Sequence, residues 1–364
     1  MQGRPIITET EENLGEGVRR IDIVPQAIEE LFYIENPHVR KNSPDAASLL
    51  ETYQKSKDVG SVYVYYPWLN LSIRMPQEEV YFRLRTIRNR NLISESEQAL
   101  FRAASVGIAG LSVGSTALSS LVQTGGPKRI TIADPDTIDI TNLNRIRATL
   151  AQVGQNKTTV TAQSAWELDP FLDLTLYESG IHKDTLEEFL GGASPLDVCI
   201  DEMDDIALKI AIRRACKVAR IPVVMATDNG DSTILDVERF DLEPTLEIFH
   251  GRINISDDEL QDMNREKFVR LANRIIDPSF FTDRQQQSLM EIGKTLSGVP
   301  QLATAASVAG AAVAYAVRRI VTKQDMPSGR YVISLEEALI SGYMEPDQKE
   351  SRKKMTETFN AAFT

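Results

Sequence analysis

The sequence predicts an α/β protein with a doubly wound, mostly parallel sheet flanked by helices, preceded by a small N-terminal α+β appendage. Two observations support this. From about residue 105 onward, short apolar runs alternate with longer amphipathic runs, a pattern typical of strand–helix units around a parallel sheet. Before that point the chain carries an amphipathic helix near 25–34, a polar stretch at 41–58 and an aromatic run at 61–75 that alternates like a strand.

Five strands and the helices between them follow from residue 105. The expected strands are 105–110, 129–134, 173–179, 196–201 and 221–227. The expected helices are 115–126, 157–170, 183–192 and 205–220. Gly125 and Gly126 suit the end of the first helix, and Pro170 stops the second. Five strands in this order predict a doubly wound sheet, which binds ligands at the carboxyl ends of its strands.

Beyond the fifth strand the pattern changes. Residues 233–249 are expected to form antiparallel strands, 256–293 are charged and helical, and 301–323 form an Ala-rich helix. Residues 329–339 are expected to supply a late edge strand with its turn, and the last fifteen residues, which are polar, are expected to be loose.

Composition excludes several classes of function. The net charge of −12 argues against nucleic acid or an anionic membrane as the main partner, because both repel an acidic surface. The Ala-rich stretch runs directly into Arg318 and Arg319 and is expected to be a buried helix. Two cysteines without a CxxC pair and three histidines exclude a zinc cluster or a disulfide framework. The N-terminus lacks the apolar segment of a secretory signal, so we expect a cytoplasmic protein.

The first strand–helix turn is GLSVGS, which begins at Gly110 and contains Gly114. Compared with a glycine-rich dinucleotide turn it is degraded, because Ser112 stands where a second glycine is expected. Asp134 follows about 24 residues after Gly110, the spacing at which an acid accepts hydrogen bonds from ribose hydroxyls. Turn and acid together allow an NAD(P)-dependent oxidoreductase.

The loop DPDTIDITNLNR, which runs from Asp134 to Arg145, is more specific. It resembles the D-x-D-x-[VI]-x-x-[ST]-N-L-x-R segment of the ThiF/MoeB family, the Rossmann-like adenylating fold shared with ubiquitin-activating enzymes. Further segments resemble that family's markers in the same order: RNRNLIS with Arg90, GQNK with Lys157, IDEMDD with Asp204, and the helix GVPQLATAASVAGAAVAYAVRRI. The resemblance covers roughly residues 88 to 322.

The resemblance implies ATP-dependent adenylation of a carboxylate with release of pyrophosphate. Arg90, Arg145 and Lys157 would neutralise the negative charge of the two reacting groups and of the departing pyrophosphate. Asp204 would hold Mg²⁺, a hard cation that prefers carboxylate and phosphate oxygen. The implied ATP-binding residues are Gly110, Ser112, Gly114, Asp134 on the ribose, Asp136, Asn142 on phosphate or loop backbone, Arg145 and Lys157.

The sequence also departs from the family's pattern. The glycine run is degraded, and the zinc-binding CxxC pairs found in several members are missing, which indicates a stand-alone, bacterial-type member without zinc. Cys199 lies in an expected strand and Cys216 in an expected helix, so both should be inert core thiols. We therefore expect no enzyme thioester, and transfer of the acyl-adenylate to a separate sulfur carrier or to an amine within the substrate.

The implied organisation has three parts: an appendage over 1–95 for dimerisation or substrate capture, an adenylation domain over 96–335 and a tail over 336–364. The expected substrate is a small ubiquitin-like protein or a peptide, and the expected assembly is a homodimer, because arginines like Arg90 serve the partner's site in this family.

Two alternative functions stay open. The NAD(P) interpretation leaves Asn142, Arg145 and Lys157 unexplained, and a catalytically silent scaffold accounts for the degraded turn. Taken alone, either Asp204 or Asp205 could be only the N-cap of the helix that follows.

Overall fold

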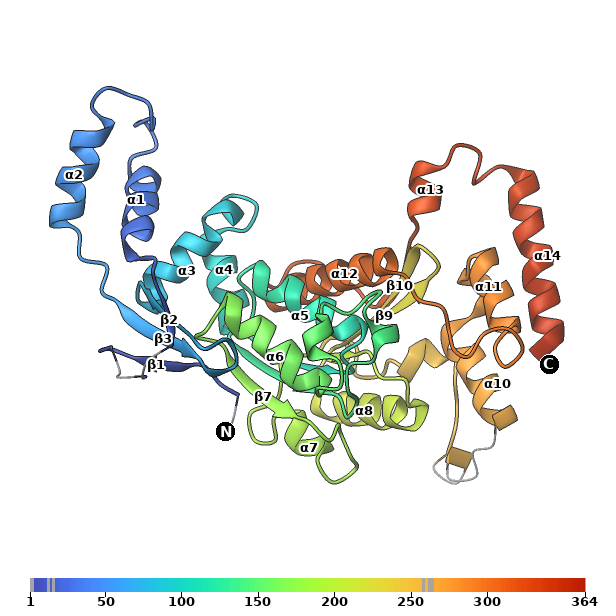
Figure 1. Cartoon of the computed structure of the whole chain (residues 1–364). Coiled ribbons are helices and arrows are strands. Elements are labelled where there is room, and N and C mark those ends of the chain that lie inside the picture. The colour runs from blue at the N-terminus through green and yellow to red at the C-terminus, as the bar shows by residue number, and fades with distance from the viewer. Residues whose placement is uncertain (1–2, 12–13, 15–16, 257–258, 261–264, 364) are drawn as a thin grey trace. The chain divides into compact units, whose positions relative to one another are not determined.

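The described residues divide into two compact units. The computed structural model describes residues 3–11, 14, 17–256, 259–260 and 265–363. The first unit is Met1–Ala99 with Gln163–Leu172, and the second is Leu100–Ala162 with Asp173–Thr364 (Figure 1). The helix α6 (Lys157–Leu168) therefore begins in the second unit and ends in the first.

The first unit is α+β, as predicted. Its sheet has the order β1-β3-β4-β2, with β1 (Ile6–Thr8), β2 (Arg19–Asp22), β3 (Val62–Tyr66) and β4 (Leu71–Met75). Its helices are α1 (Val24–Glu35), α2 (Ala46–Ser56), α3 (Glu78–Thr86) and the start of α4 (Glu95–Ala103). The helix predicted near 25–34 is confirmed as α1. The stretch at 41–58, for which no helix was predicted, contains α2.

The aromatic run at 61–75 is a hairpin and not the single strand predicted. Pro67 begins a short 3-10 turn after β3, and Asn70 adopts a left-handed conformation with φ of 47° before β4. Proline has no N–H to donate to a strand ladder, and asparagine tolerates positive φ, so these two residues reverse the chain. The β3–β4 pair buries Val64, Tyr66 and Met75 on one face.

The second unit contains a seven-stranded sheet of order β11-β10-β9-β8-β5-β6-β7. Five strands run parallel: β5 (Ser105–Ala109), β6 (Arg129–Ala133), β7 (Asp173–Tyr177), β8 (Val198–Asp201) and β9 (Val223–Asn229). The strands β10 (Ser232–Glu238) and β11 (Gly329–Ile333) extend the sheet antiparallel, and β11 forms its edge. The doubly wound sheet is confirmed, and its strand order reverses at β5, between β6 and β8.

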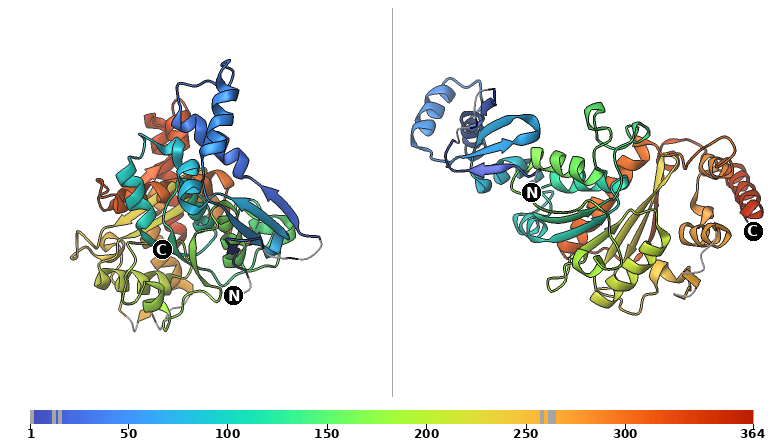
Figure 2. Two further views of the ribbon diagram at one scale, coloured as in Figure 1. Left: turned by 90° about the vertical axis from the view of Figure 1, so that its left-hand side faces the viewer. Right: turned by 60° about the horizontal axis from the view of Figure 1, so that its bottom comes forward.

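Helices cover both faces of this sheet (Figures 1 and 2). On one face, α5 (Val113–Gln123) packs against α12 (Ala303–Val321). On the other face lie α7 (Leu186–Phe189) and α8 (Ile206–Ala219). The helix predicted over 183–192 is shorter than expected, because Gly191 and Gly192 adopt positive φ values of 96° and 51° directly after it.

Small side chains let α12 lie close to α5. A Cβ at Gly310 would lie 2.5 Å from Oγ1 of Thr116, and that hydroxyl donates a hydrogen bond of 2.8 Å to the carbonyl of Ala306. By length and composition α12 could span a membrane, yet more than half of its most apolar stretch is buried within the protein. The buried Ala-rich helix predicted from sequence is confirmed.

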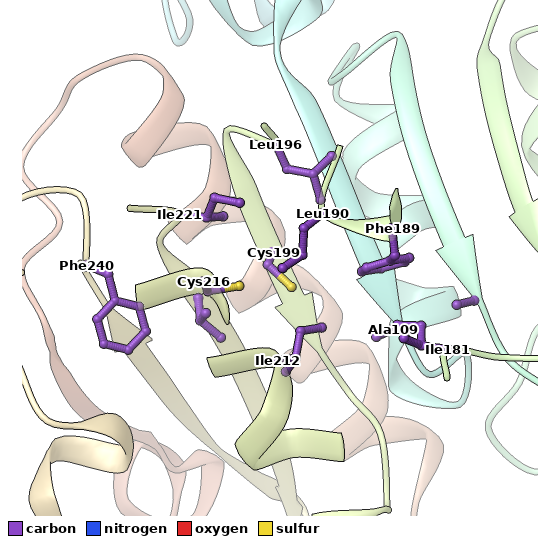
Figure 3. Close-up of a cluster of buried hydrophobic side chains, with 12 residues drawn as sticks. Ala109, Ile181, Phe189, Leu190, Leu196, Cys199, Ile212, Cys216, Ile221 and Phe240 are labelled. Atoms are coloured by element: carbon purple, nitrogen blue, oxygen red, sulfur yellow. The ribbon is translucent and has the colours of Figure 1, made fainter. Parts of the chain in front are cut away.

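The core beneath β5 and β8 holds both cysteines (Figure 3). Cys199 of β8 and Cys216 of α8 are fully buried among Phe189, Ile212 and their neighbours. Burial raises the pKa of the Cys216 thiol well above its usual value, and the adjacent Cys199 adds to the shift. A buried thiol is a poor nucleophile, so these residues are the core thiols that the sequence predicted.

A buried ion pair network ties α8 to the sheet. Arg213 is fully buried and binds Asp201 of β8, and its Nε donates to Glu238 of β10 at 2.6 Å. Its guanidinium also lies 4.0 Å from the centroid of the Phe249 ring. Burial raises the pKa of Asp201, but Lys209 and Arg213 reverse this and hold it below the usual value. One arginine thus neutralises carboxylates from two strands.

Two predictions for the C-terminal third were wrong. Of residues 233–249 only β10 is a strand, and the chain then turns into a 3-10 segment where Phe249 and His250 have φ of 50° and 55°. The polar segment that was expected to be loose is helical instead: residues 350–363 belong to α14 (Pro346–Phe363). Its Phe359 is buried, and Nε2 of Gln286 on α11 (Asp283–Met290) donates to Oγ1 of its Thr356 at 2.9 Å.

The charged segment 256–293 is partly helical, as expected. It contains α10 (Arg265–Ile276) and α11, while residues 257–258 and 261–264 lie outside the described part of the chain. Residues 335–339 were expected to form the turn after the edge strand, and they form the short helix α13 (Leu335–Leu339). Residues up to 345, in the expected tail, form a bend.

Candidate functional site

The turn after β5 brings backbone N–H groups to the carboxyl edge of the sheet. Gly110 has φ of +89°, and a Cβ there would lie 2.3 Å from the carbonyl oxygen of Glu202. The first N–H groups of any helix lack intrahelical partners. The helix α5 begins at Val113, and no side-chain cap satisfies its first N–H groups. An uncapped helix N-terminus favours an anion. Gly114 serves packing, because its Cβ would lie 2.9 Å from a methyl group of Ile108.

We expect Gly110→Ala to destabilise the second unit far more than Gly154→Ala. The two glycines have nearly equal φ values of +89° and +85°, but nothing lies within 4 Å of a Cβ at Gly154. Gly154→Ala should therefore cost only the left-handed conformation, about 1 kcal/mol, whereas Gly110→Ala adds a backbone clash. Urea unfolding of both variants checks this. Equal losses would show that the close approach to Glu202 is unimportant.

Asp134 and Asp136 follow β6 and engage Lys157. The Asp134 carboxylate is buried, and it accepts hydrogen bonds from the N–H groups of Leu111 at 2.7 Å and Asp136 at 2.9 Å. Nζ of Lys157, at the start of α6, lies 2.8 Å from Asp136 and 3.7 Å from Asp134. Burial raises the pKa of Asp134, while these N–H groups and Lys157 act against the shift. Asp134 thus fixes the β5 turn to the loop that follows β6.

That loop presents Arg145 to the start of α5. Asn142 is buried and its Oδ1 accepts a hydrogen bond of 3.0 Å from the N–H of Asp139, so this side chain shapes the loop backbone. Nε of Arg145 donates to the hydroxyl of Ser112 at 3.1 Å. Nη1 of Arg145 donates to the carbonyl of Thr141 and to Oδ1 of Asn144. A guanidinium is therefore held beside the uncapped helix terminus.

Carboxylates from β8 and β9 face this guanidinium. Asp204 is exposed just past β8, and it is Asp205 that caps α8, accepting from the N–H of Leu208 at 3.0 Å. Partial burial lowers the pKa of Arg145, and the charges of Asp228 and Asp204 oppose that shift. Arginine stays protonated under such conditions, so the site holds a fixed cation between acids.

Sequence reasoning missed Asp228. It lies near the end of β9, is 8% exposed, and its Oδ2 accepts from Nε2 of Gln301 at 3.2 Å. Burial raises its pKa to about 6, with Arg145 and Gln301 acting in the opposite direction. The signal was present, because Asp228 follows an apolar parallel strand just as Asp134 does.

The structure brings most of the predicted site residues to one edge of the second unit. They come from the turn after β5, the loop after β6, the start of α6 and the residues just past β8. These residues are Gly110, Ser112, Gly114, Asp134, Asp136, Asn142, Arg145, Lys157 and Asp204. The remaining one, Arg90, belongs to the first unit, where it is exposed and ends the 3-10 turn Ile87–Asn89.

An apolar groove of about 520 Å³ lies elsewhere in the second unit. It is lined by side chains of α12, β10, β11 and the segment before β11, among them Leu235, Val308 and Tyr331. It contains none of the predicted site residues and lacks the charged groups that a phosphate requires. We therefore assign the candidate site to the carboxyl edge of the sheet.

Two known proteins are similar to this chain in sequence. The chain is 36% identical over 278 residues to the uncharacterized protein MT1398 of Mycobacterium tuberculosis (strain CDC 1551 / Oshkosh), covering 76% of this chain and 38% of that protein. It is 27% identical over 166 residues to Ubiquitin-like modifier-activating enzyme 5 of Arabidopsis thaliana, covering 41% of this chain and 37% of that enzyme. The chain thus spans well under half the length of these two relatives.

A solved structure is also similar. The Escherichia coli tRNA N6-threonylcarbamoyladenosine dehydratase in complex with AMP has 19% identity and a TM-score of 0.47, with 66% of this chain and 96% of that chain covered. The ThiF family model matches residues 85–354, which include the whole loop from Asp134 to Arg145 and every predicted site residue. The chain belongs to the ThiF family.

Proposed function

We propose that the protein binds Mg-ATP at the carboxyl edge of its seven-stranded sheet and adenylates a carboxylate. The observation that carries this is the placement of Arg145, which the loop after β6 holds against Ser112 at the uncapped start of α5. Homologues in the ThiF family are ATP-dependent adenylating enzymes. Their chemistry needs cations and N–H groups where phosphate charge develops, and this edge supplies both.

The step is a displacement at the α-phosphorus of ATP. A carboxylate oxygen forms a bond to that phosphorus, the bond to the β-phosphate oxygen breaks, and pyrophosphate leaves with the electron pair. Arg145 and the N-terminus of α5 would stabilise the phosphate oxygens. Lys157 is oriented by Asp136, at 2.8 Å, and would add a second cation. Asp134 would accept from the ribose with the lone pairs that its two backbone hydrogen bonds leave over.

Mg²⁺ fits this residue set in a limited way. Within the described part of the chain, no group of three or more acids, histidines or cysteines could hold a metal. Mg²⁺ is commonly bound by one or two carboxylates together with substrate phosphates and water, so the exposed Asp204 suits it. When bound, the ion would neutralise charge on the phosphates.

For the substrate we propose the C-terminal carboxylate of a small ubiquitin-like sulfur-carrier protein or of a peptide. The likeness to an enzyme named for a ubiquitin-like modifier supports this class, and the net charge of −12 argues against nucleic acid. Because Cys199 and Cys216 are buried, the acyl-adenylate would pass to an external sulfur or amine without a thioester on either of them. We further propose a cytoplasmic homodimer in which Arg90 serves the partner's site.

Calorimetric titration with Mg-ATP and, separately, with NADH tests the function. Saturable binding of ATP alone supports the adenylating site. Binding of NADH alone would replace it by a nicotinamide-dependent oxidoreductase, for which Gly110 and Asp134 are the supporting residues. Silence toward both nucleotides would make a scaffold role the better interpretation.

Removal of the metal tests Asp204. We expect Mg²⁺ to strengthen ATP binding by the wild-type protein, and Asp204→Asn to abolish most of the difference between titrations with Mg²⁺ and with EDTA. Asp205→Asn is the matched control, because asparagine caps a helix as well as aspartate does and should keep the metal effect. If Asp204→Asn retains the full effect of Mg²⁺, the assignment of this residue is wrong.

A further inference from the structure

A chain of hydrogen bonds joins Arg145 to Asp228 through Asn144 of the same loop and Gln301 of the segment before α12. Nη1 of Arg145 donates to Oδ1 of Asn144, and Nδ2 of Asn144 donates to the carbonyl of Gln301 at 2.8 Å. Nε2 of Gln301 then donates to Oδ2 of Asp228 at 3.2 Å. The loop after β6, the segment before α12 and the end of β9 therefore meet around the guanidinium.

Asp228 is incompletely satisfied in this network. Its Oδ1 is buried and has no hydrogen-bond partner among the described residues. From the loop after β6 the charge of Arg145 acts on it, and from the residue after β8 the acid Glu202 opposes its ionisation. Asp204 acts on Arg145 as well. On β10 its partner Thr233 donates to the carbonyl of Thr227 instead. Arg145 is thus the charge that stabilises the Asp228 carboxylate.

A nucleotide would change this balance. Once Arg145 neutralises phosphate oxygens, it no longer compensates Asp228, and the phosphates add negative charge to a site already rich in acids. A buried carboxylate that loses its cation is costly and becomes protonated instead. Burial already raises the pKa of Asp228 to about 6, so little additional repulsion brings protonation into the neutral range.

We propose that Asp228 is a positioning residue of the nucleotide site: as a carboxylate it balances the charge of Arg145 before the nucleotide binds, and it takes up one proton from solvent when the nucleotide binds. This inference rests on the proposed nucleotide binding and goes beyond it by adding a proton to the binding equilibrium. Empty protein, Mg-ATP and one proton give a complex in which Asp228 is a neutral carboxylic acid. Its hydroxyl becomes a donor, and the charge of Arg145 then serves the phosphates alone.

The sign of the pH dependence follows. Because binding takes up a proton, affinity is highest at low pH and falls as pH rises above about 6, the value in the empty protein. Between that value and the higher pKa of the complex, affinity falls by up to about tenfold per pH unit. Asp228→Asn imitates the protonated acid at every pH, so it should remove this slope and bind more tightly than wild type at high pH.

The experiment is a calorimetric titration with ATP in excess Mg²⁺ at pH 6, 7 and 8. Wild type should lose about tenfold or more in affinity across this range, whereas Asp228→Asn should stay nearly constant and exceed wild type at pH 8. The matched control is Asp231→Asn. Asp231 is an exposed acid two residues beyond β9 that accepts from Thr304, and its variant should follow wild type.

A second measurement needs no variant. Repeating the wild-type titration at pH 7 in buffers with different enthalpies of ionisation counts the protons bound, and we expect a net uptake approaching one. No uptake, equal pH slopes for wild type and Asp228→Asn, or weaker binding by Asp228→Asn at every pH would overturn the inference while leaving ATP binding intact. If neither protein binds ATP, the proposed function and this inference both fall.

Discussion

Arg145→Ala weakens binding of Mg-ATP by about 2 kcal/mol, or roughly 30-fold, if the site acts as proposed, because hydrogen bonds to charged groups contribute on this scale. The guanidinium is held by Ser112, Thr141 and Asn144 beside the start of α5, so little rearrangement is needed before it contacts phosphate. Arg145→Lys should recover only part of the affinity, since an ammonium cannot form the same paired contacts. Calorimetry at fixed pH and salt measures all three proteins.

Arg147→Ala is the matched control for this change. Arg147 lies two residues along the same loop and donates to the hydroxyl of Ser119, in the middle of α5 and away from its N-terminus. Its removal changes the net charge equally but should leave ATP affinity within about twofold, as expected of a surface charge. Equal losses in both variants would mean that Arg145 acts only through the general charge of the loop. No loss in either would favour the scaffold interpretation.

The largest effect on stability is expected from Arg213→Leu. This change leaves Glu238 buried without its cation and leaves Asp201 with Lys209 alone, which should lower the free energy of unfolding by about 3 to 5 kcal/mol. It also removes the contact of the guanidinium with the Phe249 ring. Urea denaturation followed by circular dichroism measures the difference at neutral pH.

Lys217→Leu on the same helix separates burial from charge. Lys217 is partly exposed and its ion pair with Glu247 spans 3.7 Å, so its loss should cost less than about 1 kcal/mol. Adding Asp201→Asn and Glu238→Gln to Arg213→Leu should recover much of the stability, because the uncompensated charges are then gone. Similar losses for Lys217→Leu and Arg213→Leu would contradict a role for the buried network.

Local patterns predicted the sheet and most of the site. Apolar runs of strand length alternate with amphipathic runs. The apolar runs are recognisable because the central parallel strands β5, β8 and β9 are buried on both faces of the sheet. The loop from Asp134 to Arg145 was recognisable because its polar residues lie close together in one continuous segment of the chain. The same holds for Lys157, which begins α6, and for Asp204, which lies between β8 and α8.

The prediction for the C-terminal segment was wrong because long-range contacts determine its structure. The polar C-terminal segment forms α14 because its Phe359 is buried and its Thr356 accepts from Gln286, about seventy residues earlier. Isolated helices gain little from their own sequence, so such a helix depends on packing that a local pattern does not show. The turn at Pro67 to Asn70, by contrast, carried a local signal that the alternation of aromatic residues outweighed.

By itself the sequence determined the order of strands and helices, the glycine turn, and the acids and bases at the ends of the strands, because each depends on neighbours within a few residues. Only the tertiary structure decided which of these charges face one another. Arg145 and Asp228 lie far apart in the chain and meet because β9 lies two strands from β5 in the sheet and its carboxyl end reaches the same edge. Burial at that edge, which no single segment specifies, turns Asp228 from an ordinary acid into one whose pKa is about 6.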